Sequence, residues 1–153
     1  ASPPPPFDSL GPASGPRTAP SVIVNHGAGL DPGSYFLHKN RASLEQIEAG
    51  NFRQAARSLA LGQDYPGDAH VNLYYLADLE PILEQYGNRG YRVAQLDSAI
   101  RGGKLQLATH ALGLGTVGTT SLDNEVIDFF GPTAAGKSYM FAIVFGNRRK
   151  RHN

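Results

Sequence analysis

The eight residues from 131 to 138, GPTAAGKS, match a phosphate-binding loop letter by letter. In such a loop, backbone amides surround the phosphates, the lysine balances their charge, and the final hydroxyl holds magnesium. The loop has to leave a strand and open a helix, yet the residues after Ser138, YMFAIVFG, are β-branched and aromatic and predict a strand. Too few residues follow Ser138 to build a nucleotide-binding sheet. We therefore expect a connection between two elements with Lys137 in solvent, and nucleotide binding here is a minor alternative.

Two other groups of residues have the chemistry to contact a ligand. The small residues Gly118, Thr119, Thr120 and Ser121 follow a glycine-rich turn and allow a ligand to approach their backbone closely. The last residues, NRRKRHN, are basic, and an arginine fork suits a phosphate group. The five histidines show neither metal-ligand spacing nor a serine-histidine-aspartate pattern, and the chain has no cysteine, so we expect no metal site and no disulfide.

Composition excludes several classes of partner. The chain has 14 basic and 13 acidic residues, so its net charge of +1 gives no electrostatic reason to expect nucleic acid as a partner. No apolar run approaches the roughly 20 residues that span a bilayer, and ASPPPPF at the start is unlike a signal peptide. We expect no membrane partner, a cytoplasmic location, and a chain that is a piece of a longer one because it lacks an initiator methionine. The expected organisation is a proline-rich extended segment (1–20), one partial domain (21–147) and a basic tail (148–153).

One long helix is the main structural prediction. The residues from Gly90 to Val117 carry apolar side chains at helical spacing on two faces, and Gly113 and Gly115 end the pattern. A helix with so little polar surface belongs inside a fold or across a subunit interface. Elsewhere we expect strands over 21–25, 34–37, 71–76 and 139–145, and helices after Asn51 and over 78–86 and 124–130. The spacing of Leu44 and Ile47 is that of a helix. This irregular mixture favours the α+β class.

The residues GYRVAQLDSA and LATHALGLGTVGTTSLDNEVIDFFG resemble the C-terminal half of nitroreductase-superfamily flavoproteins, above all the SagB-type dehydrogenases that oxidise peptide azolines to azoles. Upstream, SGPRTAPSVIVNHGAGLDPGSYFL is similar to a family stretch in which a Ser-Gly-Gly turn leads into an apolar strand and a second turn. The resemblance covers roughly residues 12 to 146. It implies a mixed sheet flanked by helices, incomplete here at its N-terminus, with the long helix at a dimer interface and flavin mononucleotide (FMN) held between subunits. It also implies a strand around 44–47, in place of the helix that the spacing there indicates.

The resemblance also implies site residues. It places Ser14 and Gly15 against the flavin, and the backbone of Gly118, Thr119, Thr120 and Ser121 near the reactive N5 of its ring. A cation after the last strand, Arg148 or Arg149, would contact the FMN phosphate. Azoline dehydrogenases have a Lys-Tyr pair that handles protons where this chain has Gln85 and Tyr86, so Tyr86 is the expected proton donor or acceptor. The arginine-serine-arginine cluster that grips the phosphate in the superfamily is absent from these residues.

Two hypotheses follow from these residues. The first is an FMN-dependent oxidoreductase that acts on an azoline-like or other small organic molecule, or on a peptide, and forms a homodimer. The second is a catalytically degenerate half of a tandem or heteromeric assembly, which pairs with a second nitroreductase-like half and supplies an interface.

Overall fold

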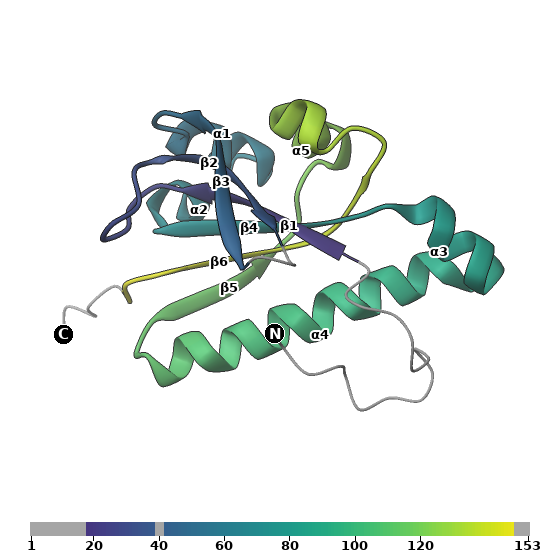
Figure 1. Cartoon of the computed structure of the whole chain (residues 1–153). Helices are drawn as coiled ribbons and strands as arrows, with labels where there is room; N and C mark the ends of the chain where they lie inside the picture. Colours follow the sequence, from purple (N-terminus) through teal and green to yellow (C-terminus); the bar gives the residue numbers. More distant parts are fainter. Residues whose placement is uncertain (1–17, 39–41, 149–153) are drawn as a thin grey trace.

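Six strands form a single open sheet in the part of the chain that the computed structural model describes, residues 18–38 and 42–148 (Figure 1). The strand order is β3-β2-β1-β4-β6-β5, and each neighbouring pair is antiparallel. The strands are β1 (Thr18–Val24), β2 (Gly33–His38), β3 (Ser43–Ala49), β4 (Val71–Ala77), β5 (Gly115–Thr119) and β6 (Ser138–Gly146).

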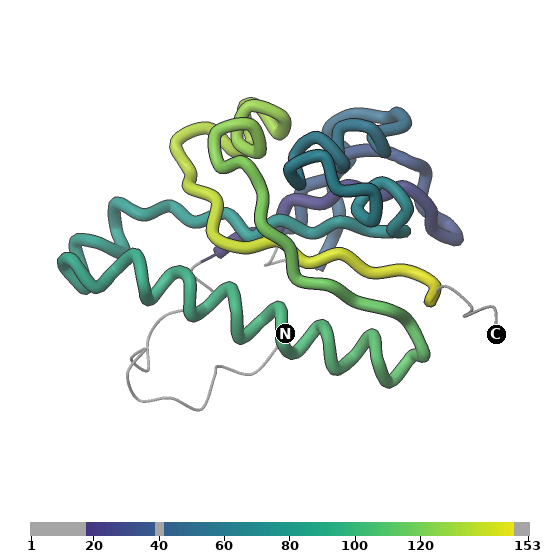
Figure 2. The backbone as a smooth tube through the Cα atoms, turned by 180° about the vertical axis from the view of Figure 1, so that it is seen from behind, coloured from purple at the N-terminus to yellow at the C-terminus, as the bar shows by residue number. Residues whose placement is uncertain are grey.

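Helices cover both faces of this sheet (Figures 1 and 2). One face carries α1 (Arg53–Leu59), α2 (Tyr65–Asp68) and α5 (Asp123–Phe130), and the other carries α3 (Leu79–Tyr86) and α4 (Gly90–Ala111). Short 3₁₀ turns, η2 (Gly87–Arg89) and η3 (Gly131–Thr133), precede α4 and follow α5. The expected α+β class and the expected sheet flanked by helices are confirmed, and the described strand pairs are all antiparallel.

The larger core lies between the sheet and the α1/α5 face. Ile23, Tyr74 and Leu76 point from the strands toward Leu59 of α1 and Phe130 of α5, and all five side chains are buried. The rings of Tyr74 and Phe130 meet edge to face with centroids 5.5 Å apart. This core fixes α5, and with it the turn that joins β5 to α5.

A smaller core on the opposite face holds α3 and α4. It consists of Ala77 of β4, Ile82 of α3, Ala94 of α4 and Met140 of β6, with Leu79 and Tyr86 packed against it. Small residues dominate the buried side of α4, which is why this helix lies close to the sheet.

The outward side of α4 corrects the expectation of a helix buried all round. Its buried residues are small or polar, whereas Leu107 is 74% exposed and Leu96 is 43% exposed. Leu96, Ile100, Gly103 and Leu107 recur at intervals of three and four residues and therefore form one stripe on the helix. In the single chain this stripe faces away from the sheet.

The ends of α4 also differ from the predicted span. The helix stops at Ala111, and Gly113 adopts a φ of 76°, which confirms the glycine stop. The residues Gly115–Thr119, expected as a turn, form the edge strand β5, and the short helix α2 was not predicted. The other predicted strands and helices are present with boundaries shifted by a few residues at most.

The GPTAAGKS stretch joins α5 to β6 and does not open a helix. The expectation that its lysine lies in solvent is wrong. Lys137 is half-buried, its Nζ donates a hydrogen bond to the Thr133 carbonyl, and Nζ lies 4.9 Å from the centre of the Phe36 ring. Burial lowers the pKa of Lys137, and the charge of Asp78 opposes this shift. The amine therefore interacts with groups of the protein itself.

Among the described helices, none has the length and apolarity to cross a bilayer.

Candidate functional site

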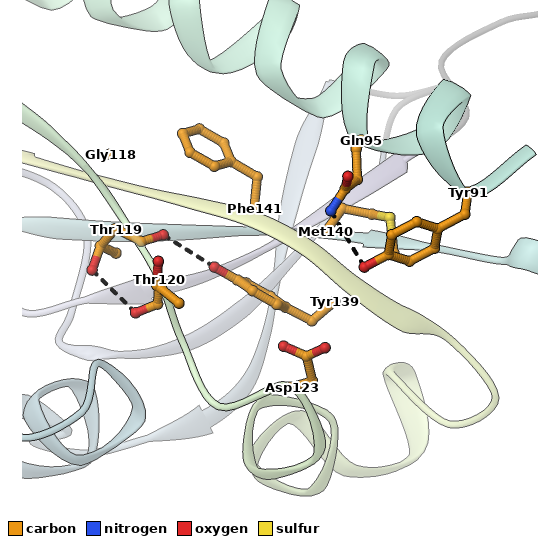
Figure 3. Close-up of a pocket in the computed structure, with 9 residues that line it drawn as sticks. All are labelled: Tyr91, Gln95, Gly118, Thr119, Thr120, Asp123, Tyr139, Met140 and Phe141. Carbon is orange, nitrogen blue, oxygen red and sulfur yellow. Dashed lines mark hydrogen bonds between the residues drawn. The ribbon is translucent and has the colours of Figure 1, made fainter. Parts of the chain in front are cut away.

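A pocket of about 420 Å³ lies where the first turns of α4 approach the ends of β5 and β6 (Figure 3). Its lining side chains come from three places in the chain: the start of α4, the segment from β5 into α5, and the start of β6. They are Tyr91, Gln95, Gly118, Thr119, Thr120, Asp123, Tyr139, Met140 and Phe141.

An irregularity in β6 shapes the pocket wall. Leu76 of β4 pairs with Tyr139 and Tyr75 pairs with Phe141, so Met140 is an extra residue without a partner on β4. Such a bulge turns two successive side chains toward the same face. Met140 packs beside Ala94 of α4, and Phe141 approaches α4 as well, while Tyr139 belongs to the opposite core.

The Phe141 ring fits between two glycines. A Cβ atom at Gly102 of α4 would lie 2.5 Å from this ring, and one at Gly118 of β5 would lie 3.0 Å from it. The ring also stacks on Tyr75, with centroids 6.4 Å apart and planes 11° from parallel. The absence of side chains at both glycines is therefore what allows α4, β5 and β6 to meet at the pocket.

The turn after β5 is held from several directions. The Tyr65 hydroxyl donates to Thr119 Oγ1 at 2.6 Å, and the Tyr139 hydroxyl donates to the Thr119 carbonyl at 3.2 Å. Beyond the turn, the Leu122 amide donates to the Leu59 carbonyl at 3.0 Å. The backbone at Thr119 and its successors is thus fixed relative to α1, α2 and β6.

The electrostatics of the pocket keep its buried phenol neutral. Burial raises the pKa of Tyr139, the polar groups of nearby Ser121 partly offset this, and the negative charge of Asp123 adds to the rise. Figure 3 shows the Asp123 carboxylate directed toward the Tyr139 ring. Tyr139 therefore acts as a hydrogen-bond donor at neutral pH.

A buried polar contact ties α4 to the beginning of β1. Asp97, which is 4% exposed, accepts a hydrogen bond of 2.9 Å from the Thr18 hydroxyl. Arg101 donates to the Thr18 carbonyl at 2.9 Å and forms an ion pair with Asp97 at 3.6 Å. Burial raises the pKa of nearby Tyr75 to about 12, with Arg101 lowering and Asp97 raising it. This contact holds the first residue of β1 against α4.

Three of the residues predicted from the sequence meet in the pocket. Gly118, Thr119 and Thr120 line it, and Ser121 is buried directly beside it. Ser14, Gly15 and Arg149 lie outside the described residues.

The other two predicted residues lie elsewhere. Tyr86 packs against the core that contains Met140 and is not among the lining residues. Arg148 is at the opposite end of β5, where its Nε donates to the Leu114 carbonyl at 3.2 Å. The sequence analysis did not single out Tyr91, Gln95, Asp123, Tyr139, Met140 or Phe141. For Tyr91 the stretch GYRVAQLDSA, which carries part of the family resemblance, was an available signal.

Comparison with known proteins agrees with this fold. Residues 17–147 match the nitroreductase family. A putative nitroreductase from Anabaena variabilis has a similar structure, with a TM-score of 0.81, 29% identity, and coverage of 86% of this chain and 27% of the other. The E. coli microcin synthetase McbBCD complex gives a TM-score of 0.74 at 20% identity, covering 88% of this chain and 53% of that one.

A putative nitroreductase from Ralstonia eutropha gives a TM-score of 0.70 at 15% identity, covering 88% of this chain and 60% of that one. This chain therefore spans between about a quarter and three fifths of the length of these three proteins. No curated protein matches it by sequence. The family match extends over most of the chain, and the overall fold resembles that of the Anabaena variabilis protein: this chain belongs to the nitroreductase family.

Proposed function

We propose that this chain forms part of an FMN-dependent oxidoreductase and that its pocket holds the flavin ring. The observation that carries this proposal is that Gly118, Thr119 and Thr120, which the family resemblance assigns to the ring, line a pocket of about 420 Å³. When bound, FMN supplies a carrier that takes up a hydride equivalent and passes electrons to an acceptor.

The residues of the pocket fit a planar, partly polar ring. Phe141 and Met140 offer apolar surface, and the turn at Thr119 and Thr120 offers backbone groups held in place. Fixed backbone dipoles can stabilise the charge that a flavin gains on reduction without reorganising. Water is displaced from the apolar walls when a ring covers them.

The phosphate would lie outside this pocket. Among the described lining residues Asp123 carries a formal negative charge and no lysine or arginine is present, so the pocket disfavours an anion. Arg148 is separated from Thr119 by the length of β5, roughly 13 Å at about 3.3 Å per residue. FMN carries its ring and its phosphate at opposite ends of a ribityl chain. We propose Arg148 and Arg149 as phosphate contacts, with Ser14 and Gly15 approaching the ring.

For proton handling we propose Tyr86. Its ring packs against the core that contains Met140, and Met140 lines the pocket. Tyr91 lies in the pocket itself, where Gln95 donates a 3.3 Å hydrogen bond to its hydroxyl. Comparing Tyr86→Phe with Tyr91→Phe separates the two tyrosines: the variant that slows turnover without weakening FMN binding has lost the proton-handling group.

The substrate that the sequence resemblance supports is an azoline-like or other small organic molecule, free or within a peptide. The residues GYR at the start of α4 and LGLG after its end, which belong to the stretches that carry the resemblance, support this choice. Gln85, which is exposed, stands where azoline dehydrogenases have lysine. A Gln85→Lys variant that gains azoline oxidation supports this substrate class, and a variant with no gain against a panel of azolines contradicts it.

We further propose that α4 mediates dimerisation, either with a second copy or with another nitroreductase-like half. The stripe of Leu96, Ile100, Gly103 and Leu107 is apolar and lies on the side of the helix away from the sheet. Burying apolar area at about 25 cal/mol per Å² favours covering such a stripe. The same stripe favours the second candidate function, a degenerate subunit that supplies only an interface.

One experiment tests the enzyme proposal directly. The enzyme of which we propose that this chain forms part is purified and reconstituted with FMN, and flavin absorbance that remains after gel filtration supports the proposal. Arg148→Ala with Arg149→Ala is expected to weaken binding by about 1.5 to 3 kcal/mol for each lost contact. Arg92→Ala, an exposed arginine of α4, is the control. A colourless protein with no FMN binding in solution, or equal binding by wild type and the double variant, contradicts the assignment.

A further inference from the structure

Two tyrosines hold the turn after β5 through their hydroxyl groups. Tyr65, at the start of α2, donates to the Thr119 side chain, and Tyr139, in β6, donates to the Thr119 carbonyl. Thr119 is 8% exposed and Tyr139 is 7% exposed. The hydrogen bond from Tyr139 is buried and the one from Tyr65 is partly buried, and a low local dielectric strengthens such bonds.

The hydrogen bonds run in a defined direction. Thr119 Oγ1 accepts from Tyr65 at 2.6 Å and donates to the Thr120 carbonyl at 3.2 Å. The Thr119 carbonyl accepts from Tyr139 (Figure 3). Two successive carbonyls of the turn therefore accept hydrogen bonds from hydroxyl groups that Tyr65 and Tyr139 supply or orient.

A carbonyl that accepts a hydrogen bond polarises its peptide group, which makes the N–H of that group a stronger donor. The peptide groups concerned carry the N–H groups of Thr120 and Ser121. We propose that Tyr65 and Tyr139 are positioning residues that set the orientation and donor strength of these two amides toward the flavin ring. This inference rests on the proposed function, and it assigns to Tyr65 a role in a pocket that its side chain does not line.

The fold at the turn does not depend on the two hydroxyl groups. Before the turn, Thr119 pairs with Ala142 in the β5/β6 ladder, and after it the Leu122 amide bonds to the Leu59 carbonyl. Both ends are thus fixed by backbone contacts. Replacing either tyrosine by phenylalanine keeps the ring and its packing and removes the donor alone. Because burial raises the pKa of Tyr139, its hydroxyl stays protonated and remains a donor over the physiological pH range.

A ligand-free measurement tests the positioning role first. Hydrogen exchange of the Thr120 and Ser121 amides is compared in wild type, Tyr65→Phe and Tyr139→Phe. The control is Tyr35→Phe, because the Tyr35 hydroxyl also donates to a backbone carbonyl, that of Asp31, at 2.6 Å in a distant hairpin. We expect faster exchange at the turn in the first two variants and unchanged exchange there in the control. Unchanged exchange in Tyr65→Phe and Tyr139→Phe overturns the inference whether or not FMN binds.

A second measurement tests the action on the flavin. In the FMN-loaded protein we expect Tyr65→Phe to weaken FMN binding by about 2- to 10-fold, the range of one lost hydrogen bond, and to shift the flavin midpoint potential. Tyr65→Phe is the decisive variant, because Tyr65 reaches the pocket only through Thr119. Thr119→Val should reproduce the shift, and Thr119→Ser, which keeps the hydroxyl, should restore the wild-type value.

The outcomes separate this inference from the proposed function. If wild type binds no FMN, the proposed function fails, and the exchange data still decide whether the tyrosines hold the turn. If wild type binds FMN but its potential and affinity are the same in Tyr65→Phe as in Tyr35→Phe, the proposed function stands and the inference is wrong.

Discussion

The Phe141 ring occupies a slot between Gly102 of α4 and Gly118 of β5. This slot predicts opposite effects on stability when alanine replaces Gly102 or the adjacent Gly103. A Cβ at Gly102 would lie 2.5 Å from the Phe141 ring, whereas one at Gly103 would meet nothing within 4 Å. Gly102→Ala should therefore lower the free energy of unfolding by about 1 to 3 kcal/mol through overpacking. Gly103→Ala should raise it by up to about 1 kcal/mol, because alanine favours the helix. Urea unfolding of both variants measures the difference, and equal effects would contradict the slot.

Tyr75 predicts a loss of stability at alkaline pH. Its pKa is raised in the folded protein from 10.0 to about 12, mainly by burial. The stability that the neutral Tyr75 phenol contributes is therefore fully present below pH 10. As the pH rises from about 10 to about 12, the free energy of unfolding falls by about 2 to 3 kcal/mol. In Tyr75→Phe the decline over this range should be smaller by that amount.

Denaturant unfolding at several pH values between 9 and 12 tests this expectation. Tyr91→Phe is the control, since it removes the hydroxyl of a tyrosine that is 42% exposed. A decline that is equally steep in wild type and Tyr75→Phe would show that this phenol does not govern the alkaline response.

From the contacts of Lys137 we expect that its replacement lowers stability slightly and that nucleotide stabilises neither the wild type nor the variant. Its Nζ contacts the Phe36 ring and donates a hydrogen bond to the Thr133 carbonyl. Lys137→Ala should therefore cost about 0.5 to 2 kcal/mol of stability. ATP with magnesium should not change the melting temperature of either protein, because a site that binds ligand would raise it. An ATP-dependent rise in wild type that the variant loses would restore nucleotide binding as a function.

At the residue scale, the sequence identified the pocket residues that offer backbone groups and missed those whose side chains form the pocket walls. Gly118, Thr119 and Thr120 were recognisable because small residues after a glycine-rich turn are unusual and matched a family pattern. Met140 and Phe141 lie in an apolar run that reads as an ordinary core strand. The bulge that turns both toward α4 depends on pairing with β4, which is far away in sequence and leaves no local signal.

At the scale of elements, a single charge should disrupt the dimer interface that we propose on the exposed stripe of α4. Leu107 is 74% exposed, so Leu107→Asp should leave the single chain folded. In a dimer the same carboxylate would be buried without a partner, and dimerisation should weaken by about 100-fold or more. Sedimentation or light scattering measures the change, and Gln106→Asp, an exposed position beside the stripe, is the control. A wild-type protein that stays monomeric at high micromolar concentration contradicts the interface.

Element types were predictable where periodicity was strong. The strands β4 and β6 and the helices α3 and α5 appear as the apolar spacing indicates. The edge strand β5 was missed because its sequence, GTVGT, combines glycine with a single large apolar residue. Its pairing with β6 decides its conformation. The apolar stripe of α4 was visible in the sequence, but which side of the helix would face the sheet was not.

At the scale of the whole molecule, the sequence predicted the α+β class and the family but not the strand order. Local patterns specify strands but not which strands lie side by side in the sheet. Here β1 pairs with β4, although β2, β3, α1 and α2 lie between them in the chain. The contact of Asp97 and Arg101 with Thr18 joins residues about 80 positions apart. Such long-range choices arise from the packing of both helical layers together, and sequence periodicity does not report them.

The place of β6 in the sheet has a consequence for the order in which the protein assembles during synthesis. Among the described strands β6 is the last to be made, yet it lies between β4 and β5. Until it leaves the ribosome, β4 has an open edge and β5 has no strand to pair with. A nascent chain halted before residue 138 therefore exposes a row of unpaired amides and carbonyls that invites association with other chains. The same late strand carries Tyr139, Met140 and Phe141, so the pocket and the completed sheet come into existence in one step.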